Sequence, residues 1–229
     1  NNYELNKDYI VESYSTLYVE VGEVLILGNR FINKGKIYNY GTIVLPVFKS
    51  ATNSNKIDNY GDIKIEGGEF GNSGTIDNYK NLIINNKEDR MGQFYNNNDS
   101  TINNKNDGKI EITDGSKLEN LNKIINEGII DVSTYNSSLI NKGIITNKGT
   151  IYGNDSNIIN KYNIFTEKDG EVNENLKSLE LKEIVTKDGN NYELNKDYIV
   201  ESYSTLSIEA GEVLIIESQY KLNRIGKIN

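Results

Sequence analysis

The reactive side chains of this sequence are mainly carboxylates and phenols. The 229 residues include neither Cys nor His, which excludes thiol nucleophiles, imidazole bases and His or Cys metal sites. Asp62, Glu66 and Glu69 stand close together in sequence and could in principle form the carboxylate pair of a glycosidase. Because 33 acidic residues produce such neighbours by chance, we assign no catalytic residue and expect no enzymatic activity.

Three short stretches have the oxygen-rich composition of cation-binding loops. They are Asn106-Asp107-Gly108, Asp169-Gly170 and Asp188-Gly189. None has the alternating acidic positions and the terminal Glu of a calcium-binding hand, so each is interpreted as a turn, where Asp, Asn and Gly are common. The sequence therefore predicts no metal and no cofactor.

Tyrosines and one long loop supply the candidate ligand contacts. Several tyrosines stand next to recurring asparagines, where stacked repeats could align the rings into an exposed strip that binds sugars or a protein partner. The alternative is that these rings pack into the corners of the fold. The loop near Asp89 to Phe94 is a second candidate. The residues assigned to ligand binding are Tyr38, Tyr40, Tyr60, Tyr79, Arg90 and Phe94.

The composition favours a packed β structure. About 37 residues are Asn and about 32 are Ile, far above ordinary usage. Ile is β-branched and promotes order, which argues against a disordered Asn-rich tract. The net charge of -8 disfavours nucleic acid and anionic membranes as partners. No apolar run is long enough for membrane insertion.

A short repeat defines the fold. Its frame is Asn-x-(Gly, Asn or Ser)-x-Ile-x-Asn, and most copies follow one another at intervals of about 19 to 26 residues, as expected for one turn of a solenoid. The last interval is shorter, at about 13 residues. The central isoleucines are Ile37, Ile57, Ile76, Ile102, Ile124, Ile145 and Ile158. The asparagines that follow them are Asn39, Asn59, Asn78, Asn104, Asn126, Asn147 and Asn160.

This frame predicts very short strands, each with one inward side chain, between two corners. Asn and Gly tolerate the backbone conformations that corners need. In coils stacked about 4.8 Å apart, the isoleucines would form an internal ladder. The Asn amides would donate to one neighbouring coil and accept from the other. We therefore predict an all-β, right-handed parallel β-solenoid (β-helix) with about 20 residues per coil.

A long repeat duplicates the start of the chain. The segment NNYELNKDYIVESYSTLYVEVGEVLIL begins at Asn1, and a copy with about four differences in 27 positions begins at Asn190. Because the second copy starts the solenoid frame again, we expect the chain to be slightly more than one unit of a tandem array. The expected parts are a cap segment (1–16), the solenoid (17–165), a connector or cap (166–189) and the start of a second repeat unit (190–229).

These patterns resemble the Asn/Gly/Ile-rich N-x-G-x-I parallel β-solenoid repeats of large surface proteins in AT-rich bacteria and of giant-virus particle proteins. The resemblance covers roughly Leu17 to Ile164 and restarts after Leu206. It implies a solenoid and supplies no active-site motif, because such solenoids occur in adhesins, fibres and polysaccharide-active enzymes alike.

The expected function is that of a structural repeat module in a surface-exposed fibre, adhesin or virion coat protein. One alternative is a glycan- or receptor-binding module, and another is a polysaccharide lyase or hydrolase on the same scaffold. The expected partners are other copies of the chain or further repeats of the parent protein, and, in the binding alternative, a glycan or a host receptor. The expected location is extracellular, at a cell surface or virion surface.

Overall fold

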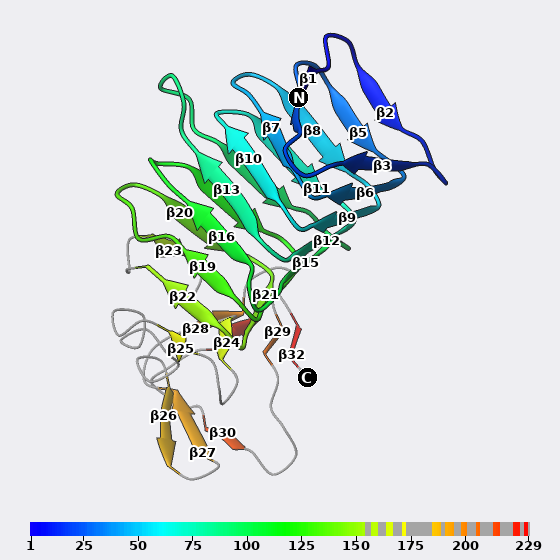
Figure 1. Ribbon diagram of the computed structural model, residues 1–229. Helices are drawn as coiled ribbons and strands as arrows, with labels where there is room; N and C mark the ends of the chain where they lie inside the picture. The colour runs from blue at the N-terminus through cyan, green and yellow to red at the C-terminus, as the bar shows by residue number, and fades with distance from the viewer. Residues whose placement is uncertain are drawn as a thin grey trace.

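The protein is a β-solenoid (Figure 1). The computed structural model describes residues 1–153, 157–159 and 164, and the backbone of 165–166, 171–172, 185–188, 191–194, 198–200, 205–206, 213–215, 222–224 and 227–228. Every regular element among them is a β-strand. Three parallel sheets wind into about seven turns with about 21 residues per turn, so the predicted all-β parallel solenoid is confirmed.

Each turn contributes one strand to each sheet. Sheet A contains β1 (Asn2–Glu4), β4 (Val24–Ile26), β7 (Thr42–Leu45), β10 (Asp62–Glu66), β13 (Asn81–Asn85), β16 (Lys109–Ile112), β19 (Ile129–Asp131), β22 (Thr150–Tyr152) and β25 (Glu171–Val172). Sheet B contains β2 (Tyr9–Val11), β5 (Phe31–Asn33), β8 (Ser50–Asn53), β11 (Glu69–Asn72), β14 (Gln93–Asn96), β17 (Lys117–Asn120), β20 (Ser138–Asn141) and β23 (Ile158–Ile159). Sheet C contains β3 (Thr16–Val19), β6 (Lys36–Asn39), β9 (Lys56–Asn59), β12 (Thr75–Asn78), β15 (Thr101–Asn104), β18 (Lys123–Asn126), β21 (Ile144–Asn147) and β24 (Ile164–Thr166).

The core consists of apolar rows that run from coil to coil. Parallel register places equivalent residues over one another, so Ile57 lies between Ile37 and Ile76 in sheet C. All three side chains are buried. Sheet A supplies two further rows and sheet B a fourth, because side chains alternate between the two faces of each strand. Burial of these rows is the main source of stability of the fold.

Two asparagine ladders border the core, as the sequence predicts. In sheet C the side-chain amide Nδ2 of each Asn donates to Oδ1 of the Asn in the next coil at 2.6–2.8 Å, from Asn39 through to Asn147. A matching ladder in sheet B runs from Asn33 to Asn141 at 2.7–2.9 Å. These side chains are buried, and the bonds explain why so many amides can lie inside. Asn160 lies outside the described residues.

One isoleucine was assigned to the wrong sheet. Ile158 was expected in the ladder of Ile145, but β23 pairs with β20 in sheet B, where Ile158 lies opposite Leu139. The position next to Ile145 in sheet C belongs to Ile164. The reason is that sheet B strands also end in an apolar-x-Asn pattern, such as Leu139-Ile140-Asn141. The interval from Ile145 to Ile158 is therefore the spacing between a strand of sheet C and the next strand of sheet B, and not the length of a coil.

Residues 1–16 make two faces of the first coil. Strand β1 pairs with β4, and β2 pairs with β5, in parallel. This coil differs from the others at the ladder positions, because Val11 lies opposite Asn33 and Val19 lies opposite Asn39. Valine has no amide, and the buried Oδ1 atoms of both asparagines have no hydrogen-bond partner.

The second copy of the long repeat pairs its strands in the same way. Strand β27 (Asn191–Leu194) pairs in parallel with β30 (Val213–Ile215), with Asn191 opposite Val213 as Asn2 is opposite Val24. Two further parallel pairs follow, β28 (Tyr198–Val200) with β31 (Leu222–Arg224) and β29 (Thr205–Leu206) with β32 (Lys227–Ile228). Strand β26 (Val185–Asp188) pairs with β27 in the antiparallel direction. Most of the expected connector, 166–189, lies outside the described residues.

Candidate functional site

The four candidate tyrosines form parts of two columns. Tyr40, Tyr60 and Tyr79 directly follow the sheet C asparagines, and their rings stack at centroid distances of 5.1 and 4.5 Å. Tyr38 projects from the outer face of sheet C, where it stacks on Tyr18 at 5.3 Å. Both columns arise because coils about 4.8 Å apart repeat the same residue type at the same position.

Stacking covers the middle ring of the three-tyrosine column. Tyr60 lies between Tyr40 and Tyr79 with interplanar angles of 8° and 9°, so both faces of its ring are covered. Burial, and then the proximity of Tyr79, raise the pKa of Tyr60. Burial, and then the proximity of Tyr60, raise the pKa of Tyr40. A sugar that packs on an aromatic ring needs a free ring face, which Tyr60 does not offer.

The outer face of sheet C carries a chain of paired charges. Lys36 lies 3.4 Å from Asp58, Lys56 lies 3.2 Å from Asp58, and Lys56 also pairs with Asp77. Asn103 donates from Nδ2 to Asp77 at 2.6 Å. Burial alone would raise the pKa of Asp77, but the hydrogen bonds from Lys56 and Asn103 lower it below its usual value. The lysine and aspartate charges on this face therefore neutralise one another.

The three neighbouring carboxylates do not converge. Asp62 and Glu66 occupy the two ends of β10, about 13 Å apart along the strand, whereas the carboxylate pair of a glycosidase is about 5 to 9.5 Å apart. Asp62 accepts a hydrogen bond from Asn81 at 2.8 Å, and Glu66 pairs with Lys87 at 2.5 Å. Glu69 belongs to β11 in sheet B. The spacing does not suit the glycosidase reaction.

The two loop residues assigned to ligand binding have different positions. Phe94 is fully buried in β14 and stacks on Phe70 at 5.2 Å, so its assignment as a ligand contact is wrong. It is the second residue of β14 and occupies an inward position of sheet B. Arg90 is exposed in the loop, and its guanidinium carbon lies 4.6 Å from the ring centroid of Phe48.

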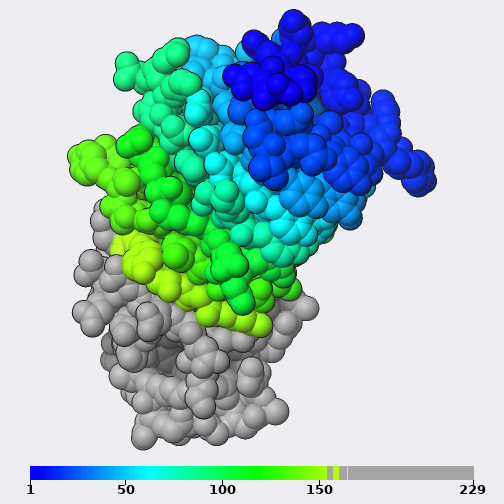
Figure 2. Space-filling view, in the orientation of Figure 1, coloured from blue at the N-terminus to red at the C-terminus, as the bar shows by residue number. Residues whose placement is uncertain are grey.

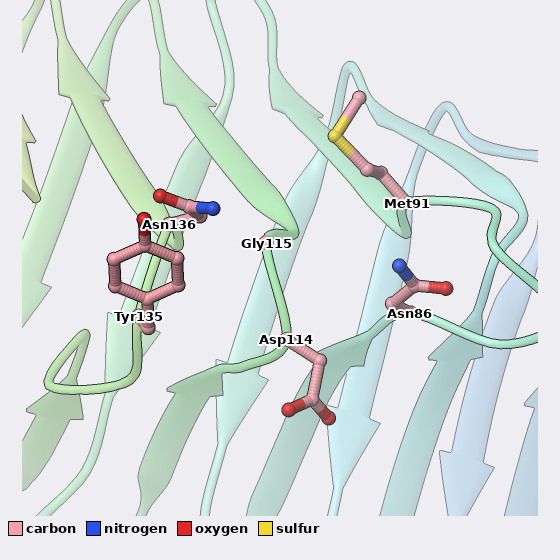
Figure 3. A pocket seen from close by; sticks show the side chains of 6 residues that line it. All are labelled: Asn86, Met91, Asp114, Gly115, Tyr135 and Asn136. Carbon is pink, nitrogen blue, oxygen red and sulfur yellow. The ribbon is translucent and has the colours of Figure 1, made fainter.

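An open groove lies between three loops that connect sheet A to sheet B. The loops are 86–92, 113–116 and 132–137, and in the space-filling view the first and the third project from the same side of the solenoid (Figure 2). The groove has a volume of about 490 Å³. Asn86 and Met91 lie on one side, Tyr135 and Asn136 on the other, and Asp114 and Gly115 between them (Figure 3).

Backbone conformation and hydrogen bonds hold these loops in place. Asp114, Gly115 and Asn136 have φ values of 54°, 78° and 59°, a left-handed conformation that Asp, Asn and Gly tolerate. Ser116 accepts a bond from Gly92 N at 3.1 Å. Ser137 accepts one from Gly115 N at 3.3 Å. Each loop is thus tied to the next, and the groove is built on fixed backbone.

The described residues show no metal centre. No group of three or more acidic side chains within this part of the chain is arranged to hold an ion. Asn106-Asp107-Gly108 forms a turn closed by the bond from Gly108 N to Lys105 O at 2.7 Å. Residues 169–170 and 189 lie outside the described residues. No helix in the described part is long and apolar enough to cross a membrane.

The groove is the feature that sequence reasoning missed. Its residues come from three loops, and only the loop near Asp89 to Phe94 was considered as a ligand contact from the sequence. Comparison of the chain with protein-family models, with curated proteins and with solved structures finds no significant match. Functional conclusions for this chain therefore depend on its own geometry.

Proposed function

We propose that the chain is a structural repeat module, a stiff spacer in a surface-exposed fibre, adhesin or virion coat protein. The observation that carries this proposal is the continuity of the ladders. Apolar rows and asparagine ladders pass through successive coils of the described core. Such a rod resists bending because every coil is hydrogen-bonded to the next along all three sheets.

The outer surface supports the same function. The stacked tyrosines and the pairs Lys36–Asp58 and Lys56–Asp77 on sheet C are contacts between coils, so they add to the cohesion of the rod. The near-identical segments that begin at Asn1 and Asn190 start the same strand pairing, which favours further repeats or other copies of the chain as partners. The resemblance to surface repeats supports an extracellular location at a cell or virion surface.

Length measurement tests the spacer function. About seven turns at about 4.8 Å each give a rod about 34 Å long. Proteins containing one, two and three tandem copies of residues 1–189 should therefore lengthen by at least this amount per copy in electron micrographs and in small-angle X-ray scattering. A maximum dimension that stays constant as copies are added would overturn the proposal. Antibody labelling of intact source cells or particles tests the location.

A further inference from the structure

We propose that the groove between loops 86–92, 113–116 and 132–137 binds a neutral hexopyranose, as a free sugar or as a residue of a glycan. This site is separate from the spacer function, because it depends on side chains that make no contribution to the ladders.

The first observation is a free aromatic face. Tyr135 is 86% exposed, and no other aromatic ring stacks on it in the described part of the chain. It therefore differs from Tyr60, whose two faces are covered. The apolar C–H face of a pyranose ring packs against such a ring, and Met91 on the opposite side of the groove supplies a second apolar contact.

The second observation is a set of polar side chains that line the same groove (Figure 3). Asn86, Asp114 and Asn136 line the groove, and none of their side chains forms a hydrogen bond to another described residue. Carboxylate and amide groups together can accept from and donate to neighbouring sugar hydroxyls. Pockets that bind small molecules combine apolar surface with a few polar groups in this way, at volumes of about 300 to 1,000 Å³.

The third observation concerns charge. The chain carries a net charge of -8, and Asp114 adds a carboxylate to the groove itself. The two cations of the first loop are engaged elsewhere, because Lys87 pairs with Glu66 and Arg90 lies over Phe48. A uronic acid or another anionic sugar would be repelled, so the site fits a neutral sugar.

The test is a titration of the full chain with three neutral probes and one anionic probe. The neutral probes are methyl β-D-glucopyranoside, methyl β-D-galactopyranoside and methyl α-D-mannopyranoside, and the anionic probe is methyl β-D-glucuronide. Saturation-transfer NMR and chemical-shift titration should detect at least one neutral probe with a Kd of about 1 to 10 mM, as expected for a small ligand in an open site. The shifts should concentrate on the side-chain amides of Asn86 and Asn136.

Substitutions distinguish binding in the groove from binding to other exposed tyrosines. Tyr135→Ala should weaken binding at least tenfold, and Asp114→Asn, which keeps the left-handed turn, should weaken it severalfold. Tyr14→Ala is the matched control, because Tyr14 is fully exposed, has a φ of 70° and lies in the first coil. Thermal denaturation of all three variants checks that they fold. Absence of binding for every neutral probe, equal binding by Tyr135→Ala, or preference for the glucuronide would overturn the proposal.

Discussion

Tyrosine side chains have opposite surroundings on two sides of the solenoid, stacked on one side and unstacked on the other. At the corner from sheet C to sheet A, the connection is short in successive coils, so Tyr40, Tyr60 and Tyr79 stack in register. At the corner from sheet A to sheet B, the loops differ in length, and Tyr135 has no ring above or below it in the described part of the chain. Constant connections produce columns that stabilise the rod, whereas variable connections leave side chains free for a ligand.

The same contrast extends to the polar groups. The carboxylate of Asp77 on sheet C is satisfied by Lys56 and Asn103, and its lowered pKa reflects those bonds. The carboxylate of Asp114 in the groove has no such partner among the described residues. A carboxylate that is bonded to neighbouring side chains stabilises the fold, whereas a carboxylate without such a partner in a groove can accept hydrogen bonds from a ligand. Substitutions on the two sides should therefore differ in their effect on stability.

The largest effect is expected from Asn104→Leu. Leu has a similar size, but Asn104 Nδ2 donates to Asn126 Oδ1 at 2.7 Å and to the carbonyl oxygens of Gly108 and Ile129 at 3.0 and 2.9 Å. Loss of these bonds leaves buried acceptors unpaired and should lower the free energy of unfolding by about 3 kcal/mol or more. Urea denaturation followed by circular dichroism measures this change.

The matched control on the loop side is Asn136→Gly. Asn136 has a φ of 59°, which Gly adopts easily, and its side chain is exposed. The expected change is within about 0.5 kcal/mol. If Asn104→Leu and Asn136→Gly unfold at the same urea concentration, the buried asparagine ladder does not contribute more to stability than an exposed loop asparagine.

Tyr60→Ala should have an intermediate effect. It removes the middle ring of a column and both stacking contacts, which are worth about 1 to 2 kcal/mol together. Tyr135→Ala removes an unstacked ring and should change the free energy of unfolding by less than about 0.5 kcal/mol. The same urea titration compares the two variants, and a larger loss for Tyr135→Ala would contradict the structural role of the column.

Sequence periodicity was sufficient to predict the ladders but not the groove. Ile57 and Asn59 recur with the coil, so their frame predicted both the fold and the stacking of equivalent residues. The assignment of Ile158 failed because two sheets share the apolar-x-Asn pattern. The assignment of Phe94 failed because the loop ends at Gly92, so Phe94 already belongs to β14 and occupies one of its inward positions.

The sequence marked only one of the three loops of the groove, the one near Asp89 to Phe94. Met91, Asp114 and Tyr135 are separated by more than one coil's length from first to last, and they share no motif. Only the parallel register of β13, β16 and β19 brings their loops together. Loop residues outside the repeat frame are therefore the ones to inspect once the register of a solenoid is known.

Val19→Asn should produce a small gain in stability. Val19 lies opposite Asn39, whose buried Oδ1 has no partner, and an asparagine at position 19 would supply the missing amide. After subtraction of the lost apolar burial, a gain of about 0.5 to 1 kcal/mol is expected. Val21→Asn is the control, since Val21 is exposed in the following turn. A loss of stability in the position 19 variant, measured by urea denaturation, would mean that apolar packing matters more than the ladder there.

The smallest effect concerns alkaline pH. The pKa values of Tyr40 and Tyr60 are raised in the folded chain, first by burial and then by neighbouring tyrosines, so the unfolded chain loses its phenol protons more readily. The stabilisation is complete below the unfolded pKa of about 10 and is lost as pH rises through the folded values. The melting temperature of the wild-type protein should therefore fall above about pH 10, and Tyr60→Phe should reduce that fall because it removes one ionising group and keeps the ring stack. Tyr135→Phe is the control on the loop side, where no ring stacks on Tyr135 in the described part of the chain. If Tyr60→Phe and Tyr135→Phe reduce the fall in melting temperature equally, the effect of tyrosine ionisation on stability does not depend on stacking in the column.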